Sequence, residues 1–332
     1  MRQPLLLRVM LIGFVSSCWA QTASSGPILV GAGFSNPFPI AVAPGQLLML
    51  FVQPASGYNP LGSPPTVSAT FESPSTTEPM PVLQVSQISG PCIIPSNATG
   101  CPNQLAVTVQ IPFNAPNSPP VGSNILLAPS FVSVSVNGVA TPFAAVEASQ
   151  NQIHILTACD LIAGGSPTAS TGGLHCLPMV THADGRAVTA ILPAQAGEEL
   201  IAYAIGLGQT NPALTTGQPA AQSSPTVAQF NLDFNYRSNA LATQPGAVGA
   251  TTVQPLFTGA TQGFVGLYQI NFIVPPSPAG IQPCVDVAVT PDLSLGGYPV
   301  RSNLTVSIGS DFSFDGAGIC VMPQLVLDPP GA

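Results

Sequence analysis

The sequence predicts an all-β protein built from two sandwich-like modules, and three observations support this fold class. The chain has 332 residues, more than one hydrophobic core usually holds, so two domains are expected. Its 38 prolines and 32 glycines follow no collagen period and divide the chain into segments too short for long helices. Apolar and polar residues alternate along many of these segments, with the period of two typical of half-buried strands.

Two strand patterns are clearest in the N-terminal half. Residues 105–111 place aliphatic side chains at every second position, and so do residues 132–136. The pair Asn137-Gly138 then predicts a two-residue hairpin turn before a further strand at 139–146. Other strands are expected at 46–52, 66–72, 82–88 and 153–157.

Strands are also expected throughout the C-terminal half, and no segment has a convincing helical pattern. Phe230, Leu232, Phe234 and Tyr236 alternate with polar residues, which predicts one aromatic face for the core and one solvated face. Other strands are expected at 187–192, 200–205, 268–274, 285–290 and 304–308.

The two halves share short sequences in the same order. Residues 43–48 open one apolar strand and residues 195–200 open another, each with a glycine at its third position. The strand that ends at Pro112 matches residues 268–275. These similarities predict two copies of one β-module.

The module boundary is placed in a stretch of small turn-forming residues near 163–173. The first module is expected at 28–160 and the second at 176–310. A C-terminal tail is expected at 311–332.

The first twenty residues have the pattern of a secretory signal peptide. Arg2 and Arg8 precede a short apolar run, and small residues lead to a cleavage site after Ala20. An alternative is a bacterial lipobox at 14–18, in which Cys18 carries a lipid anchor. No later stretch approaches eighteen apolar residues, so no transmembrane segment is expected after signal removal. The protein is therefore expected to be secreted or displayed at the cell surface.

Six cysteines remain after the signal, and an oxidising compartment favours their pairing into disulfides. They are Cys92, Cys101, Cys159, Cys176, Cys284 and Cys320. Fifteen connectivities exist, and pairing in sequence order is the simplest. The alternative is a zinc site, but the chain has no C-x-x-C spacing and His175 is the single histidine near a cysteine. Neither a metal nor another cofactor is expected.

The charge of the chain argues against two classes of partner. After the signal there is no lysine, and Arg186, Arg237 and Arg301 stand against 13 acidic residues. Nucleic acid and anionic lipid surfaces both need clustered cations, so neither is an expected partner. The expected partner is an unknown extracellular protein or glycan.

Four segments of the second half occur together in a known family. Residues 180–185, 193–198, 203–208 and 263–271 closely resemble the Solibacter-type uncharacterised C-terminal domain of exported acidobacterial proteins. The likeness is strong from about 178 to 309 and fainter from about 28 to 157.

This chain departs from that family at 230–237, where the family usually has a short glycine-led strand, and in its cysteines and its tail from Cys320 onward. The resemblance implies two tandem immunoglobulin-like β-sandwiches at or outside the cell surface. It implies no activity.

No catalytic constellation is predicted. The chain lacks a G-x-S-x-G nucleophile elbow, and His154 is expected to be an outward or hydrogen-bonded strand residue. His182 and Asp184 are expected to make local turn hydrogen bonds. Glu198 and Glu199 are adjacent on a strand, so they should point to opposite faces and stay solvated instead of forming a glycosidase pair.

Other binding motifs are incomplete. Residues 311–316 copy the first half of an EF-hand loop, but Met322 stands where the closing carboxylate is needed, so calcium is a minor hypothesis. Gly206-Leu207-Gly208 follows a strand without a helix after it, so it lacks the context of a phosphate cradle. Carbohydrate binding usually needs exposed aromatic side chains. Trp19 lies in the signal, and Tyr203 and Tyr236 follow core-like patterns, so the sequence gives less support to a lectin.

The sequence therefore predicts a secreted or surface-displayed, non-catalytic scaffold, adhesion or binding protein. The alternative is an enzyme or accessory module that acts on extracellular polysaccharide. A third interpretation is a subunit of a surface assembly that docks through sheet edges.

Overall fold

A computed structural model describes residues 26–32, 40–54, 63–90, 101–116, 130–160, 176–246, 252–285 and 300–324. All regular elements within these ranges are β-strands, which confirms the all-β prediction. Within the same ranges, no helix is long and apolar enough to cross a membrane.

Two sheets are formed by the N-terminal half. The first has the order β1 (Ile28–Ala32), β3 (Leu47–Gln53), β7 (Cys101–Gln110) and β6 (Val82–Gly90). The second has the order β2 (Ile40–Val42), β10 (Ala144–Ala148), β8 (Ser130–Val136), β4 (Val67–Glu72) and β5 (Thr77–Met80), with β9 (Val139–Ala140) paired to β8. All pairs are antiparallel except β2 with β10.

Two further sheets are formed by the C-terminal half. The larger has the order β11 (His154–Ile155), β13 (Glu199–Ile205), β17 (Tyr268–Ile273), β16 (Phe257–Ala260) and β14 (Ser224–Pro225), with β12 (Val180–His182) paired to β13. The smaller has the order β15 (Asn231–Asn235), β18 (Leu304–Gly309) and β19 (Phe314–Ile319).

Each pair of sheets encloses its own hydrophobic core. In the N-terminal half, side chains such as Val107 on β7 and Val134 on β8 are fully buried in one cluster. In the C-terminal half, Ile270 on β17 and Val306 on β18 are fully buried in another. We call these two bodies the N-terminal and C-terminal sandwiches. The alternation seen in the sequence produces this arrangement because every second side chain of a strand points to the same face.

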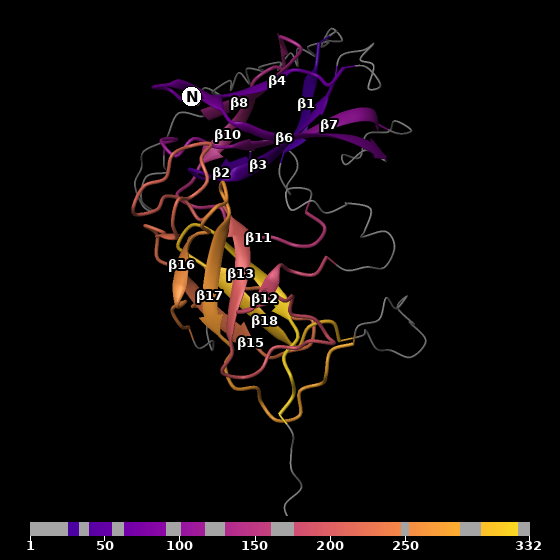
Figure 1. Ribbon diagram of the computed structural model, residues 1–332, viewed down its shortest axis with the longest axis vertical. Coiled ribbons are helices and arrows are strands. Elements are labelled where there is room, and N and C mark those ends of the chain that lie inside the picture. Colours follow the sequence, from indigo (N-terminus) through magenta and orange to yellow (C-terminus); the bar gives the residue numbers. More distant parts are fainter. Residues whose placement is uncertain are drawn as a thin grey trace, which may run out of the picture.

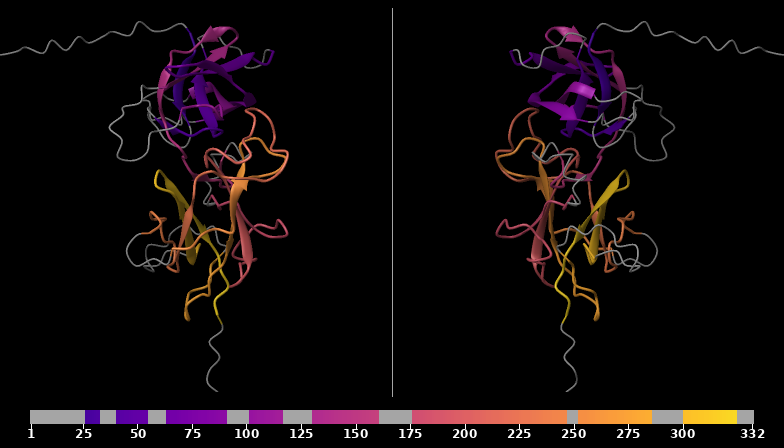
Figure 2. Two further views of the ribbon diagram at one scale, coloured as in Figure 1. Left: turned by 90° about the vertical axis from the view of Figure 1, so that its left-hand side faces the viewer. Right: turned by 90° about the vertical axis from the view of Figure 1, so that its right-hand side faces the viewer.

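The sandwiches are stacked end to end along the long axis of the molecule. Figure 1 shows β1, β4 and β8 at one end and β13, β15 and β18 at the other. The two perpendicular views of Figure 2 show the same arrangement. The described part of the chain is therefore elongated.

Most expected strands are present, and the hairpin turn is confirmed. Asn137 and Gly138 both have positive φ values, 51° and 82°, between β8 and β9. The strand expected at 187–192 is wrong, since this segment makes an isolated bridge between Thr181 and Ala187 instead. The strand expected at 285–290 falls largely outside the described residues.

Two expected module limits also need correction. β11 lies in the segment assigned to the first module, 28–160, but it pairs with β13 of the C-terminal sandwich. The expected tail, 311–332, contains β19, which pairs with β18 from Phe314 to Ile319. β19 belongs to the sandwich because Ala317 and Ile319 are buried in its core.

The turns that open β3 and β13 have matching hydrogen bonds. Gly45 N donates to Ile111 O at 3.0 Å, and Gly197 N donates to Val274 O at 2.8 Å. Both glycines have positive φ, 73° and 83°. At both turns the side chain that follows the glycine, Gln46 or Glu198, accepts a backbone N–H from three residues earlier. The tandem repeat stays a prediction, which these matching contacts support.

Candidate functional site

His154 lies between two carboxylates where the chain enters the C-terminal sandwich. Its Nε2 donates to Asp160 Oδ2 at 3.0 Å, and its Nδ1 lies 3.4 Å from Asp315 Oδ2 on β19. Burial lowers the pKa of His154, but hydrogen bonds to the two carboxylates and their negative charges outweigh burial and raise it to about 9. The imidazole is therefore protonated at neutral pH, and the expected hydrogen-bonded strand histidine is present.

The same carboxylates also hold the backbone. Asp160 Oδ2 accepts the N–H of Thr157 at 2.6 Å, and Asp315 Oδ2 accepts the N–H of Ile155 at 2.8 Å. Asp315 belongs to the half EF-hand motif at 311–316, so that motif uses one of its carboxylates inside the protein. Among the described residues, no group of three or more His, Cys, Asp or Glu side chains is placed to hold a metal ion.

His182 at the end of β12 and Glu198 in the turn before β13 form a second polar contact. His182 is buried, and its Nδ1 donates to Glu198 Oε1. Glu198 Oε2 also accepts the N–H of Gln195 at 2.9 Å. The expectation of a solvated Glu198 is therefore wrong, because this carboxylate closes the turn before β13. Glu199 is exposed, as expected, and accepts from Asn271 Nδ2 at 2.9 Å.

Asp184 makes the local turn contacts that were expected of it. Its carboxylate accepts from the backbone N–H and from Nε of Arg186, at 3.1 and 2.7 Å. These bonds, the backbone one foremost, lower the pKa of Asp184. The Asp184 side chain is exposed to solvent, in agreement with its expected place in a surface turn.

Two cysteine pairs are joined as disulfides, Cys159 to Cys176 and Cys284 to Cys320. Both follow the sequence order. The side chains of Cys92 and Cys101 lie outside the described residues, so their pairing stays a prediction.

Gly206 and Gly208 lie against residues 149–153, which join β10 of the N-terminal sandwich to β11 of the C-terminal sandwich and which we call the connector. A Cβ atom at Gly206 would lie 1.9 Å from the carbonyl oxygen of Gln152, and one at Gly208 would lie 2.2 Å from that of Gln150. Gln152 N donates to Gly206 O at 2.7 Å. The glycines are needed because the two backbones approach too closely for any side chain.

The sandwiches meet at a joint that combines an apolar cluster with polar contacts. Leu47 from the start of β3 packs with Leu156 and Ile205, and all three are buried. Gly266 lies against Leu47, since a Cβ at Gly266 would be 2.6 Å from the Leu47 Cδ2 atom.

Hydrogen bonds cross the same joint. The buried Gln110 of β7 accepts the N–H of Gly217 at 2.6 Å. The hydroxyl of Thr216 accepts the N–H of Phe113 at 3.0 Å, and Gln209 Nε2 donates to Phe113 O at 3.3 Å. The joint therefore combines apolar packing with hydrogen bonds that require one particular placement of the two sandwiches. Sequence reasoning missed it, because its residues come from strands and turns that are far apart in the sequence.

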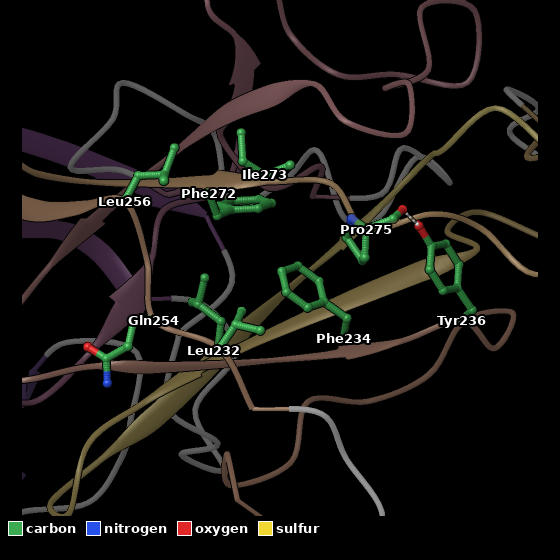
Figure 3. A pocket seen from close by; sticks show the side chains of 9 residues that line it. Leu232, Phe234, Tyr236, Gln254, Leu256, Phe272, Ile273 and Pro275 are labelled. Carbon is green, nitrogen blue, oxygen red and sulfur yellow. Dashed lines mark hydrogen bonds between the residues drawn. The ribbon is translucent and has the colours of Figure 1, made fainter.

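A pocket of about 470 Å³ opens at one edge of the C-terminal sandwich, between its two sheets (Figure 3). Leu232 and Phe272 form part of its floor and are buried in the core. Tyr236 stands at one end, where its hydroxyl donates to Pro275 O. Burial raises the pKa of Tyr236 to about 12. Phe234 and Tyr236 had been expected on the core face, and the structure shows that they also line this pocket.

Tyr203 and Tyr268 follow the core-like pattern to different degrees. Tyr268 is fully buried, and its hydroxyl donates to Gly208 O. Burial raises its pKa. Tyr203 is half-buried. Tyr58 and Tyr298 lie outside the described residues.

No family model matches the sequence, and no curated protein matches it. Among solved structures, the adhesin InvE of Yersinia pseudotuberculosis aligns with 87% of this chain at 10% identity and a TM-score of 0.20. The alignment spans 57% of the InvE chain. The C-terminal domain of the Streptococcus agalactiae AgI/II polypeptide BspA aligns with 86% of this chain and 95% of its own, at 7% identity and a TM-score of 0.19. These scores are too low to support a functional argument, so the proposals below rest on this chain's own residues.

Proposed function

We propose that this chain is an exported, non-catalytic scaffold or adhesion protein in which two β-sandwiches act as one stiff spacer. The joint between the sandwiches is the observation that carries the proposal. A joint with buried Leu47 and Ile205, hydrogen bonds through Gln110 and Thr216, and glycine contacts too close for side chains leaves little room for hinge motion. Stiff spacing is useful to a protein that presents a surface, and enzymes that close on substrates need hinges.

The polar clusters support the non-catalytic part of the proposal. Both ring nitrogens of His154 face carboxylates of the protein itself, and His182 uses one nitrogen on Glu198 and has the other 3.3 Å from Leu192 O. A general base needs a nitrogen that can reach a substrate proton. Neither histidine presents one in this arrangement.

Export is supported by two features of the chain. Its first twenty residues have the signal pattern described above, and two disulfides are typical of an oxidising compartment. We propose, on the four matching segments, that the chain is a relative of the Solibacter-type domain family. Whether the mature protein begins at Gln21 or at a lipidated Cys18 decides between secretion and anchoring, and an intact mass of protein from the exporting host reads this directly.

Small-angle X-ray scattering of the full chain tests the spacer. A stiff joint predicts one elongated shape whose maximum dimension does not change with ionic strength. Leu47→Asp places a carboxylate in the buried joint and should loosen it, giving a broader distance distribution while both sandwiches stay folded. Leu241→Asp is the matched control, because Leu241 is 84% exposed.

Two results would contradict the proposal. Equal scattering profiles for the Leu47→Asp variant and the wild type would mean that the joint does not set the shape. Turnover of an extracellular polysaccharide that is lost on His154→Asn or Glu198→Gln substitution would show an enzyme instead of a scaffold.

A further inference from the structure

The pocket at the edge of the C-terminal sandwich is independent of the joint and has its own chemistry. Its volume, about 470 Å³, falls in the range of small-molecule sites. Its floor is formed by core residues, and its mouth includes Val253, Leu256 and Ile273, which are 38%, 59% and 42% exposed. A ligand that fills this cavity removes the apolar surface of its walls and opening from water, which favours binding.

The walls carry no charge. Tyr236 is the single ionisable residue among those that line the pocket in the described part of the chain, and its hydroxyl is already used on Pro275 O. The whole chain has a formal net charge of −8. An anionic ligand would therefore lose its hydration without gaining a partner, and it would also be repelled by the protein.

Aromatic rings favour a flat ligand. The rings of Phe234 on β15 and Phe272 on β17 are 6.1 Å apart at an interplanar angle of 49°. Tyr236 lies further along the same side of the pocket as Phe234 (Figure 3). Tilted rings of this kind pack well against the face or edge of another ring.

One backbone edge of the pocket offers polar contacts. Leu232 exchanges two hydrogen bonds with Val253, at 2.8 and 2.9 Å, on the side of β15 that faces away from β18. Alternate residues of an antiparallel strand turn their N–H and C=O to the same side, so those of Phe234 also face away from β18. A ligand with one N–H or carbonyl could bond there.

We propose that this pocket binds an uncharged aromatic small molecule that carries a single polar group. The proposal goes beyond the spacer function and does not depend on it. The uncharged aromatic walls and the polar backbone edge beside Phe234 together favour this class of ligand.

Two dyes with the same ring skeleton test the proposal on the full chain. N-phenyl-1-naphthylamine is neutral and has one N–H, and 8-anilino-1-naphthalenesulfonate adds a sulfonate to the same rings. The neutral dye should bind one site per chain with a saturable rise in fluorescence. The sulfonate should bind roughly tenfold more weakly or worse, because its charge would have to be buried unpaired.

A pair of variants tests whether the neutral dye binds in this pocket. Val253→Trp fills the pocket from its mouth and should weaken binding of the neutral dye roughly tenfold or more. Val227→Trp makes the same substitution at a residue that is 60% exposed and does not line the pocket, and it should bind like the wild type. Urea unfolding of each variant shows whether the fold is kept.

If Val253→Trp fails to fold, Leu256→Glu replaces it, with Leu241→Glu as its control. A carboxylate at the mouth should weaken the neutral dye, while the control should not. Equal binding of both dyes, absence of a saturable site, or unchanged binding in a mouth variant that keeps its fold would overturn the assignment. Each of these results leaves the scattering test of the spacer untouched.

Discussion

At the scale of single residues, His154 shows how one side chain can join two parts of a chain. Its neighbours Asp160 and Asp315 come from the segment that follows β11 and from β19. Each carboxylate also accepts a backbone N–H, from Thr157 or from Ile155, so the imidazolium lies between two acceptors that are already in position. The contribution to stability is electrostatic, and it should follow the protonation of the ring.

The pH dependence of stability tests this contact. The folded pKa of His154, about 9, lies above its ordinary value of 6.5, so the protonated ring favours the folded state. Its contribution, on the order of 3 kcal/mol, is fully present below pH 6.5 and is lost as the pH rises through about 9. The difference in unfolding free energy between wild type and His154→Asn, measured in urea, should shrink across this window. A difference that stays constant from pH 6 to 10 would refute this assignment.

Gly266 is a residue at which added volume would press on the apolar cluster of the joint. It has a φ of 64°, and a Cβ there would meet Leu47. Gly263, with a φ of 84°, has open space around the same position. Gly263→Ala should therefore cost about 1 kcal/mol for its backbone conformation alone, and Gly266→Ala should cost about 1 to 3 kcal/mol more through the clash.

Thermal unfolding of the two variants measures the difference. Adding Leu47→Ala to Gly266→Ala should recover part of the loss, because the clashing side chain is removed. Equal destabilisation by the two alanine substitutions would mean that Leu47 moves aside without cost.

At the scale of elements, each of the two described disulfides joins a cysteine that lies close to a strand to a cysteine further away in the sequence. Cys159 and Cys176 close a loop beside the two-residue strand β11, and Cys284 is tied to Cys320 at the end of β19. The sequence separations are 17 and 36 residues. A cross-link of either length restricts the unfolded chain.

Replacement of each pair by serine should lower the unfolding free energy by about 3 kcal/mol for Cys159 with Cys176, and by about 4 kcal/mol for Cys284 with Cys320. Urea unfolding under non-reducing conditions measures both values. A non-reducing peptide map checks the pairs and tests the remaining expectation, Cys92 with Cys101. Peptides that link cysteines in another order would contradict the arrangement.

Strands were predicted correctly where the alternation of apolar and polar residues reflects burial of one face, and incorrectly where it does not. β8 and β15 follow their patterns because one face of each strand packs against a core. Residues 187–192 have apolar side chains but lie in a turn region, and Ile191 is 81% exposed. β19 was missed because its two glycines interrupt the alternation of apolar and polar side chains. At Gly316 the glycine is required by packing, since a Cβ there would lie 2.4 Å from the Cβ of Ala242.

At the scale of the whole molecule, the end-to-end arrangement of the two sandwiches follows from a short, tightly held connector (Figure 2). Asn151 Oδ1 accepts from the hydroxyls of Ser310 and Ser313, at 2.7 and 2.8 Å, and Ile153 N donates to the same Ser313 at 3.0 Å. The connector is thus bound to the C-terminal sandwich soon after it leaves β10. The stiffness expected in the scattering test originates here as much as in the apolar cluster around Leu47.

The sequence by itself determined the all-β class, most of the strands and the hairpin at Asn137-Gly138, because alternation and turn chemistry are local properties of the chain. Its sequential cysteine order also agrees with the two described disulfides. The tertiary structure alone decided the carboxylates around His154, the joint at Leu47 and Gly266, and the pocket beside Phe234. Each of these is built from residues far apart in the sequence, such as Ile155 with Asp315 and Phe234 with Phe272, which a one-dimensional pattern cannot bring together.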